Sequence, residues 1–224
     1  MERLPFTDTS LSGPEYIRSK RKRQMDIVGA SALSVALGPI IAGGAVAAAI
    51  ATHSTPIYRQ ERYGMDGEVF VMNKLRTIPP KAVEETNGAQ YGNLDPRTGK
   101  VGNLLRTMNI DEMLQLTNIL VGDMSLVNIR GVTDKTVERL EDADPILFND
   151  WWYCYTLGRP GLCGPGQDMP KDGPDATPDQ YVRAMIHDIK FVENACFEND
   201  MKYLQDTPKK LAKVAIKAIQ RAVG

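Results

Sequence analysis

The sequence predicts an α+β protein: a mostly helical domain with one short β-hairpin, a long apolar helix near the N-terminus and an amphipathic helix at the C-terminus. Three observations support this class. Residues 27–51 contain no charged side chain. Two short runs of strand-forming residues flank an Asp-Gly turn signal at 66–67. Apolar residues recur with helical spacing in 110–120, 178–192 and 208–223.

Length and charge limit the kinds of protein that this chain can be. Its 224 residues can hold one good-sized globular domain and a small appendage. A net charge of −1 argues against a nucleic-acid partner, because nucleic-acid-binding domains are usually strongly basic. Cys154, Cys163 and Cys196 are odd in number and widely spaced, which predicts neither a zinc site nor a disulfide framework. A reducing, cytoplasm-facing location fits best.

A basic cluster at 18–23 precedes the uncharged run. As one straight helix this run would be roughly 37 Å long, enough to cross a hydrocarbon core of about 30 Å. Gly38-Pro39 lies at its midpoint, however, and proline interrupts a helix. Two arms of about 12 residues are each too short to cross, so one interpretation is a re-entrant helix that dips into one leaflet. The basic residues at 18–23 and the later Arg59 and Arg62 would then lie on the same, cytoplasmic side of the membrane.

Two alternatives for this segment stay open on the residues alone. Kinked spanning helices are common, because prolines are tolerated within membranes. A cleaved signal peptide would also be apolar, although the run is longer than the usual apolar core of such peptides. We divide the chain into an arm with the basic cluster at 1–24, the membrane helix at 25–52, a domain at 53–206 and a surface helix at 207–224.

A β-hairpin is expected directly after the membrane segment. Residues 57–62 and 68–75 have the composition of strands, and the turn lies at 65–67. Alternation along a strand would place Lys74 and Arg76 on the same face. Two neighbouring cations could hold a diphosphate, or they could be solvated edge charges that discourage strand aggregation. Residues 78–94 are rich in proline, glycine and polar residues and predict a surface loop.

The adjacent carboxylates Asp111 and Glu112 follow Asn109 and open a run with helical apolar spacing. Acids are favoured in the first turn of a helix, where backbone N–H groups are free. Arginines flank the pair in sequence, a combination suited to phosphate chemistry. Arg106 has mostly apolar neighbours, so it needs a partner such as Asp111 or a ligand phosphate. The alternative is a capping box, in which Glu112 only satisfies a free N–H.

The rest of the chain supplies further helices. Residues 134–150 predict a short helix limited by Pro145, and the aromatic cluster at 151–155 suits either a membrane interface or a core. The glycines of 159–167 could let N–H groups approach an anion, or could form a simple turn. Residues 207–224 place lysines and an arginine on one helical face, which fits a helix on an anionic membrane or one packed on the domain with a solvated face.

The central segment resembles the bacterial sugar transferase family, the monotopic phosphoglycosyl transferases. Members carry an Asp-Glu dyad followed by Pro-Gln, an Asn, Gly-Asp-Met-Ser and Gly-Pro-Arg-Pro. The corresponding positions here are Asp111-Glu112, Leu114-Gln115, Asn118, Gly122-Asp123-Met124-Ser125 and Asn128-Ile129-Arg130-Gly131. The dyad and the arginine are retained, but the three prolines are not. The resemblance covers roughly residues 20–205.

Further family motifs occur in the same order along the chain. The hairpin matches at Gln60, Arg62, Gly64, Lys74, Arg76 and Thr77. The loop 159–167 resembles the family's Arg-Pro-Gly-x-Thr-Gly-x-x-Gln, with Cys163 in place of threonine. Asp188 matches a later Asp-x-x-Tyr motif, in which Phe191 replaces the tyrosine. The resemblance also implies a re-entrant helix broken at a proline, the place that Pro39 occupies.

What the resemblance implies is transfer of a phosphosugar from a UDP-sugar to a membrane polyprenol phosphate, with release of UMP. Asp111 would be the nucleophile that forms a phosphosugar-aspartyl intermediate, and Glu112, with Asp111, would ligate Mg²⁺. The residues expected to bind substrate are Lys74, Arg76, Arg97, Arg106, Arg130, Arg159, Gln167 and Asp188. The protein would be monotopic in the bacterial inner membrane, with its catalytic domain at 53–206 in the cytoplasm. Further candidate partners are membrane lipid, a second copy of the chain and downstream glycosyltransferases.

Two other functions remain as alternatives. The missing prolines around Arg130 could alter phosphate binding, so the chain could be a catalytically silent membrane scaffold for a partner glycosyltransferase. It could also be a membrane-anchored binding protein unrelated to sugar transfer.

Overall fold

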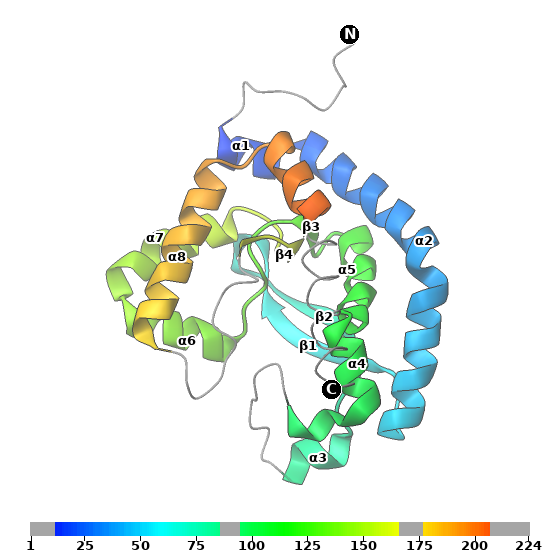
Figure 1. The fold of residues 1–224 in the computed structure, drawn as a ribbon. Coiled ribbons are helices and arrows are strands. Elements are labelled where there is room, and N and C mark those ends of the chain that lie inside the picture. The colour runs from blue at the N-terminus through cyan, green and yellow to red at the C-terminus, as the bar shows by residue number, and fades with distance from the viewer. Residues whose placement is uncertain (1–11, 86–94, 166–176, 207–224) are drawn as a thin grey trace.

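The computed structural model describes residues 12–85, 95–165 and 177–206, and every structural statement below refers to these residues. They are mostly helical with two small sheets (Figure 1). The α-helices are α1 (Gly13–Arg18), α2 (Lys20–Thr52), α3 (Pro80–Glu85), α4 (Gly99–Thr107), α5 (Leu116–Val121), α6 (Asp134–Ala143), α7 (Pro145–Thr156) and α8 (Pro178–Glu193). The strands are β1 (Ile57–Tyr63), β2 (Val69–Leu75), β3 (Ser125–Val127) and β4 (Gly161–Cys163), and the 3₁₀ helices are η1 (Met65–Gly67), η2 (Pro96–Thr98) and η3 (Ile110–Gln115). A further helical segment spans 197–206.

Helix α2 begins at Lys20, so the basic cluster belongs to the helix and the start lies five residues before the predicted one. Ser19 caps it by accepting a hydrogen bond from the Lys22 N–H. The predicted break at Pro39 is not seen, because α2 continues through this residue as one helix. A proline removes one backbone hydrogen bond, which can bend a helix without ending it. In Figure 1, α2 arcs over the top of the molecule and down one side.

Helix α2 lies against the domain near both of its ends. Its buried residues form one stripe along the helix in two groups, Lys22, Met25, Asp26 and Ala30 near the start and Gly44, Ala48 and Thr52 near the end. Near its end the approach is close, because a Cβ at Gly44 would lie 2.8 Å from Ile110 Cγ2. From residue 27 onwards, the surface of the helix away from the stripe is apolar and largely exposed, with Val35 83% exposed.

This helix is long and apolar enough to cross a membrane. Its most apolar 18-residue window has a mean hydropathy of 2.0, and 11% of that window is buried within the protein. A core helix of a water-soluble domain would be mostly buried. Helix α2 is therefore a candidate membrane segment.

The predicted hairpin is confirmed. β1 and β2 pair antiparallel from Ile57↔Leu75 to Tyr63↔Val69, and η1 forms the connection at the predicted turn. Asp66 and Gly67 in this connection both have positive φ, as the Asp-Gly signal suggests. The hairpin lies between α2, α4 and α5 on one side and α6–α8 on the other (Figure 1).

A second pairing was not predicted: β3 and β4 form a two-stranded parallel sheet. It requires glycine, since a Cβ at Gly161 would lie 2.2 Å from Asn128 N and one at Gly164 2.1 Å from Asn128 O. The Gly161 N–H donates to the Ile129 carbonyl at 2.7 Å. Close backbone packing therefore accounts for these two glycines, whereas the sequence suggested an anion-binding loop or a simple turn.

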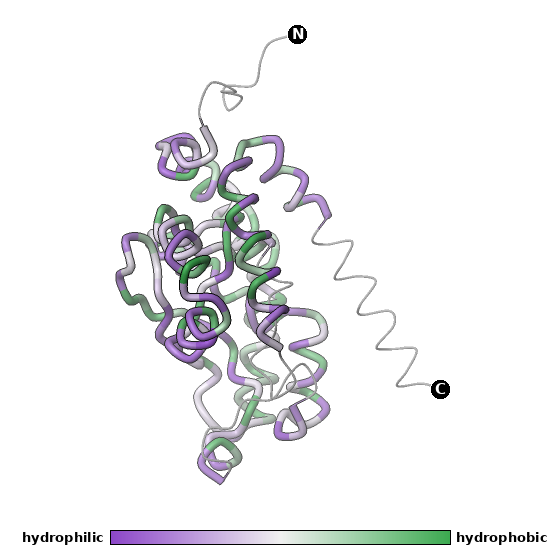
Figure 2. Tube along the Cα trace, turned by 90° about the vertical axis from the view of Figure 1, so that its left-hand side faces the viewer, coloured by the Kyte–Doolittle hydropathy of each residue, from purple (hydrophilic) through white to green (hydrophobic). Residues whose placement is uncertain are grey.

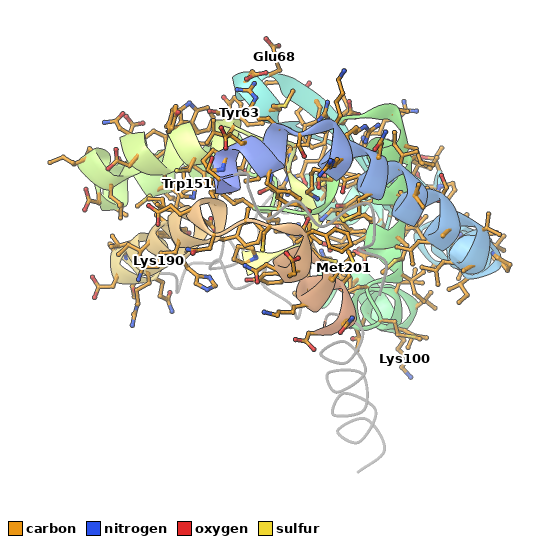
Figure 3. The ribbon with its side chains drawn as sticks, turned by 90° about the horizontal axis from the view of Figure 1, so that it is seen from above. Tyr63, Glu68, Lys100, Trp151, Lys190 and Met201 are labelled. Atoms are coloured by element: carbon orange, nitrogen blue, oxygen red, sulfur yellow. The ribbon has the colours of Figure 1, made fainter. Side chains whose placement is uncertain are left out.

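The main core lies between the hairpin, α5 and helices α6–α8. Figure 2, with the α6–α8 side facing the viewer, shows hydrophilic and hydrophobic residues alternating along the helices, as expected for helices that cover a core. Trp151 lies in the interior between α7 and α8, whereas Glu68 and Lys100 lie at the edges of the molecule (Figure 3). The aromatic cluster at 151–155 thus contributes Trp151 and Tyr155 to the core, although Tyr153 is exposed.

Two helical predictions and one loop prediction need adjustment. The expected helix at 134–150 is two helices, because Asp144 ends α6 and caps α7, whose first residue is Pro145. Residues 80–85 of the predicted surface loop form the short helix α3. The run that starts at residue 110 is 3₁₀ before it becomes α5. The helix predicted from residue 178 is confirmed as α8. The predicted amphipathic helix at 207–224 lies outside the described residues.

Candidate active site

Asp111 and Glu112 lie in η3, directly before α5. Asn109 precedes them in the left-handed conformation, with φ 51° and ψ 26°, and its side chain makes no capping hydrogen bond. The capping-box alternative is therefore wrong. The Glu112 carboxylate faces cations from two other elements instead.

Lys74 and Arg130 both bind the carboxylate of Glu112. Lys74 Nζ lies 3.1 Å from Glu112 Oε1, and Arg130 Nη2 donates to the same oxygen. Burial would raise the pKa of Glu112, but the charges of Arg130 and Lys74 outweigh this effect and hold the pKa well below its usual value. Glu112 therefore stays ionised throughout the neutral range.

Asp111 is in the opposite situation. Asp111 is 8% exposed, and its buried Oδ1 has no hydrogen-bond partner among the described residues. Burial and the negative charge of Glu112 raise the pKa of Asp111 to about 6, although Lys74 and Arg106 oppose the shift. At neutral pH the group is mostly ionised and weakly engaged, which suits a carboxylate that attacks a substrate.

The hairpin presents Lys74 to the dyad, and Asn118 of α5 fixes the hairpin in place. The Asn118 side chain accepts from the Asn73 N–H at 2.9 Å and donates to the Val71 carbonyl at 2.7 Å, as a neighbouring strand would. Asn118 also donates to Asp123 Oδ2 at 3.0 Å. The sequence placed Asn118 in a motif but gave it no role, because a buried amide that pairs with a strand leaves no signature in the spacing.

Arg97 and Arg106 meet at Asp95. The Arg97 guanidinium binds both Asp95 oxygens, at 2.8 and 2.7 Å, and Arg106 Nη1 lies 3.8 Å from Asp95 Oδ2. This Nη1 is buried without a hydrogen-bond partner among the described residues. Arg106 is near enough to Asp111 to lower its pKa, and its Nη1 donor makes no hydrogen bond among the described residues. Arg97, in contrast, binds the Asp95 carboxylate.

Three other predicted site residues contact different parts of the protein. Arg76 lies beyond the end of β2, where the alternation that paired it with Lys74 no longer holds, and donates to the Thr55 and Ile57 carbonyls. Arg159 donates to the Gly122 carbonyl at 2.7 Å. Asp188 accepts a hydrogen bond from Trp151 Nε1 at 2.9 Å in the core.

Burial raises the pKa of Asp188 to about 7, with the Trp151 hydrogen bond opposing the shift. Gln167 lies outside the described residues. Of the predicted site residues, the structure gathers Lys74 and Arg130 on Glu112, next to Asp111 in the chain, and places Arg106 near enough to lower the pKa of Asp111. Substrate binding by Arg76, Arg97, Arg159, Asp188 and Gln167 stays a prediction.

The donor set at the dyad fits Mg²⁺ in part. Among residues 12–85, 95–165 and 177–206, no three His, Cys, Asp or Glu side chains are grouped to hold a metal ion. Mg²⁺ often uses only one or two carboxylates together with substrate phosphates and water. Lys74 and Arg130 both bind Glu112 through Oε1, so Oε2 takes part in neither ion pair. Asp111 Oδ1 has no hydrogen-bond partner among the described residues. These two oxygens are suitable ligands.

A second buried group of charges lies at the start of α2. Lys22 Nζ binds Asp26 Oδ1 at 2.9 Å, Asp200 Oδ2 at 3.1 Å and Ser125 Oγ at 2.6 Å. Tyr16 donates to Asp200 Oδ2 at 2.8 Å. We call these five residues the anchor cluster, and Lys74, Arg106, Asp111, Glu112 and Arg130 the site cluster. The anchor cluster ties α1, α2, β3 and the segment 197–206 together.

Comparison with known proteins supports the resemblance. The sequence model of a family described as bacterial sugar transferase matches residues 17–214. A UDP-glucose:undecaprenyl-phosphate glucose-1-phosphate transferase of Caulobacter vibrioides is 30% identical over 194 residues, 87% of this chain and 70% of the relative. A protein of the same name from Escherichia coli K12 is 38% identical over 128 residues, 57% of this chain and 26% of that relative.

A third relative has a different sugar in its name. The UDP-N-acetylgalactosamine-undecaprenyl-phosphate N-acetylgalactosaminephosphotransferase of Aeromonas hydrophila is 29% identical over 183 residues, 81% of this chain and 41% of the relative. The matched part thus spans about a quarter of the E. coli relative and less than half of the Aeromonas relative.

Proposed function

The chain belongs to the bacterial sugar transferase family, and we propose that it transfers a phosphosugar from a UDP-sugar to a polyprenol phosphate, releasing UMP. The names of the relatives favour undecaprenol phosphate as the acceptor, and UDP-glucose or UDP-N-acetylgalactosamine as the first donors to test.

The state of Asp111 carries this proposal. The carboxylate is buried among charges, its Oδ1 has no hydrogen-bond partner among the described residues, and its pKa of about 6 leaves it ionised at neutral pH. Asp200 of the anchor cluster also has an unpartnered Oδ1, but its Oδ2 binds both Lys22 and Tyr16, whereas no cation among the described residues lies within 4.0 Å of the Asp111 carboxylate. An unpaired and ionised oxygen beside cations is what attack on a phosphate requires.

The reaction has two displacements at one phosphorus. An Asp111 oxygen attacks the phosphorus next to the sugar, the bond from that phosphorus to the bridging oxygen breaks, and UMP leaves with that oxygen. The acceptor's phosphate oxygen then attacks the same phosphorus, and the bond to Asp111 breaks. The products are a polyprenyl diphosphate sugar and the free carboxylate of Asp111, so every atom is accounted for.

The cations of the site cluster stabilise the phosphates. Arg130 and Lys74 lie on Glu112 beside the nucleophile, and Arg106 has a free Nη1 donor, so all three can reach phosphate oxygens as the donor enters. Glu112 Oε2 and Asp111 Oδ1 would hold a bound Mg²⁺ ion, which supplies positive charge to the diphosphate. Glu112 keeps its charge during the reaction because its pKa is low.

Contacts of α2 support a monotopic arrangement. Near its start, a Cβ at Gly29 would lie 2.5 Å from Leu126 Cδ1, and near its end Gly44 approaches Ile110. A domain that packs near both ends of one apolar helix is best accommodated with both ends on the same side of the bilayer. We place that side in the cytoplasm of the bacterial inner membrane, where the basic residues at 18–23 favour it. The phosphate of a lipid acceptor would then meet the dyad at the membrane surface.

The test is release of UMP by the full chain in lipid nanodiscs with Mg²⁺, polyprenol phosphate and a panel of UDP-sugars. We expect release with at least one donor, and a loss of at least about a thousand-fold for Asp111→Asn. When the acceptor is withheld, mass spectrometry should find a phosphosugar addition on the Asp111 peptide. Asp200→Asn is the matched control, because Asp200 is also a buried carboxylate but belongs to the anchor cluster. At equal folded fraction it should retain activity.

Absence of UMP with every donor in the panel would refute the transferase proposal. It would favour the silent scaffold, since the chain lacks the three prolines of the family motif.

A further inference from the structure

The loop that carries Arg130 is fixed on its N-terminal side by β4. The Asn128 N–H donates to the Cys163 carbonyl at 3.0 Å, and the Ile129 carbonyl accepts from the Gly161 N–H at 2.7 Å. The Ile129 side chain is buried in the core. This side of the loop continues the β3–β4 pairing and is held by the main chain.

The C-terminal side of the same loop is held by the end of β1. Arg62 Nη1 donates to the Gly131 carbonyl at 2.8 Å, and the Tyr63 N–H donates to the Val132 carbonyl at 3.1 Å. One side-chain hydroxyl joins these two segments. Tyr155 OH accepts from the Val132 N–H at 3.2 Å and donates to the Tyr63 carbonyl at 2.5 Å.

Tyr155 is itself rigidly placed. It is 2% exposed, and its ring stacks on Trp151 and Trp152 with centroids 4.9 and 5.6 Å apart. Trp151 is fixed in turn by its hydrogen bond to Asp188. Burial raises the pKa of Tyr155, so the hydroxyl keeps its proton and can donate to Tyr63. A hydroxyl on such a rigid ring can hold a loop to within about 0.5 Å.

We propose that Tyr155 is a positioning residue that holds Arg130 against Glu112 by fixing the loop at Val132. The expected effect of Tyr155 on kcat rests on the proposed function, whereas its expected coupling to Glu112 in unfolding does not. Both cations on Glu112 then depend on the same hairpin. Lys74 lies on β2, and Arg130 lies in a loop whose C-terminal side is attached at Val132 to Tyr63, the end of β1.

The need for this support follows from Gly131. Glycine directly after Arg130 gives the loop more conformational freedom than any other residue would. Without the Tyr155 hydroxyl, the C-terminal side keeps the hydrogen bonds from Arg62 and Tyr63 and the buried Val132 side chain, but the main chain at Val132 is held less firmly, so the long Arg130 side chain can leave Glu112.

A double-mutant cycle in urea unfolding tests the positioning role without any activity. Tyr155→Phe keeps the ring and removes the hydroxyl, and Glu112→Gln removes the charge that Arg130 binds. If Tyr155 acts through Arg130, the two substitutions will not act independently. The fold-change in the unfolding equilibrium constant of the double variant will then differ from the product of the two single-variant fold-changes by at least about twofold to threefold. The part of the loss that comes from Val132 alone appears in both backgrounds and cancels.

Tyr16→Phe provides the matched control. It also removes a buried hydroxyl hydrogen bond, but in the anchor cluster. Its cycle with Glu112→Gln should be additive within error. An additive cycle for Tyr155, or equal coupling in both cycles, would overturn the proposal.

A kinetic measurement adds a readout that loss of stability would not produce. At equal folded fraction, Tyr155→Phe should lower kcat about tenfold, and Gly131→Ala in the same chain should restore it at least about twofold by stiffening the loop. A methyl group fits at residue 131, where the nearest atom would be Pro160 Cβ at 3.4 Å, and Gly131 is not among the residues with positive φ. Tyr16→Phe should leave kcat unchanged.

Absence of the kcat loss, or of the rescue, would also count against the positioning role. If the unchanged chain releases no UMP, the proposed function fails, and the unfolding cycle still decides the role of Tyr155.

Discussion

The anchor cluster and the site cluster contain similar residues in different states. In the anchor cluster Lys22 contacts both Asp26 and Asp200, and Asp26 Oδ1 also accepts from the Leu126 N–H at 2.9 Å and from Ser125 Oγ at 3.0 Å. In the site cluster Glu112 is paired twice, but among the described residues no cation lies within 4.0 Å of the Asp111 carboxylate. Within the described part of the chain, each cluster leaves one buried carboxylate oxygen without a hydrogen-bond partner, Oδ1 of Asp200 and Oδ1 of Asp111.

The difference lies in what the other oxygen does. Asp200 Oδ2 binds both Lys22 and Tyr16, so that carboxylate is fixed in the fold. The Asp111 carboxylate is instead influenced by a hydrogen bond with its own backbone N–H and by the more distant charges of Lys74 and Arg106, and its pKa of about 6 leaves it ionised at neutral pH. Pairing of every charged residue is therefore typical of a cluster that holds helices together, and one unpaired carboxylate is typical of a cluster that acts on a ligand.

The largest effect is expected from Lys22→Met in the anchor cluster. It leaves two buried carboxylates without their cation, so the free energy of unfolding should fall by about 3–5 kcal/mol. Chemical unfolding followed by tryptophan fluorescence measures it. Lys20→Met is the control, because Lys20 is exposed two residues earlier in the same helix and should change stability by less than about 0.5 kcal/mol. Similar losses for the two variants would remove the basis for calling this cluster an anchor.

Glu112→Gln should lower the free energy of unfolding by about 2–4 kcal/mol, because Lys74 and Arg130 lose their shared partner in a mostly buried site. Since the pKa of Glu112 is lowered by folding, this stabilisation is present above the unfolded pKa and is lost as the pH falls. Urea unfolding at pH 7 provides the measurement. Glu84→Gln, on the exposed side of α3, should have almost no effect. Equal stability of the two variants would mean that the Glu112 pairs contribute nothing to the fold.

Asp111→Asn should raise the free energy of unfolding, whereas Glu112→Gln should lower it. Folding raises the pKa of Asp111, so the ionised carboxylate destabilises the fold above about pH 6, and the amide should increase the free energy of unfolding at pH 7.5 by about 1–2 kcal/mol. The gain should fade as the pH falls through 6 towards 4. The Asp26→Asn variant, measured in parallel, should be less stable than the unchanged protein, because Asp26 is paired in the anchor cluster. A loss of stability for Asp111→Asn would mean that this carboxylate is well paired after all.

The acid limb of the transfer rate should reflect the same carboxyl group. A protonated Asp111 cannot attack phosphorus, so with a pKa of about 6 the rate at pH 5 should be about tenfold lower than at pH 7. Arg106→Gln should move the limb to higher pH, because the Arg106 charge lowers the pKa of Asp111. The folded fraction, measured over the same range, serves as the control. A rate that is flat between pH 5 and 7 would exclude Asp111 as the titrating group.

Local features were predictable because local residues decide them. The Asp-Gly pair fixed the hairpin connection, where Asp66 and Gly67 have positive φ. Helix α8 followed from the spacing of Tyr181, Met185 and Val192, all of which are buried. The start of α2 was placed five residues late, because the basic residues from Lys20 were assigned to an arm although Ser19 caps the helix before them.

Site residues were predicted less evenly. The dyad, Lys74 and Arg130 were expected and lie together. Arg76, Arg97 and Arg159 were chosen for charge and motif, yet in the structure they bind carbonyl groups or Asp95. An arginine is recognisable in a sequence, but its partner depends on which backbone or carboxylate oxygen the fold brings near it.

The sequence alone determined the chemistry available: two adjacent carboxylates, several cations and an apolar segment long enough for a membrane. The tertiary structure decided which carboxylate is free. It placed Lys74 from β2 and Arg130 from the loop after β3 on Glu112, and it left Asp111 Oδ1 without a partner among residues 12–85, 95–165 and 177–206. The reason is that pKa and reactivity depend on burial and on charges within a few ångströms, and folding supplies these from residues 18 and 38 positions distant in the chain.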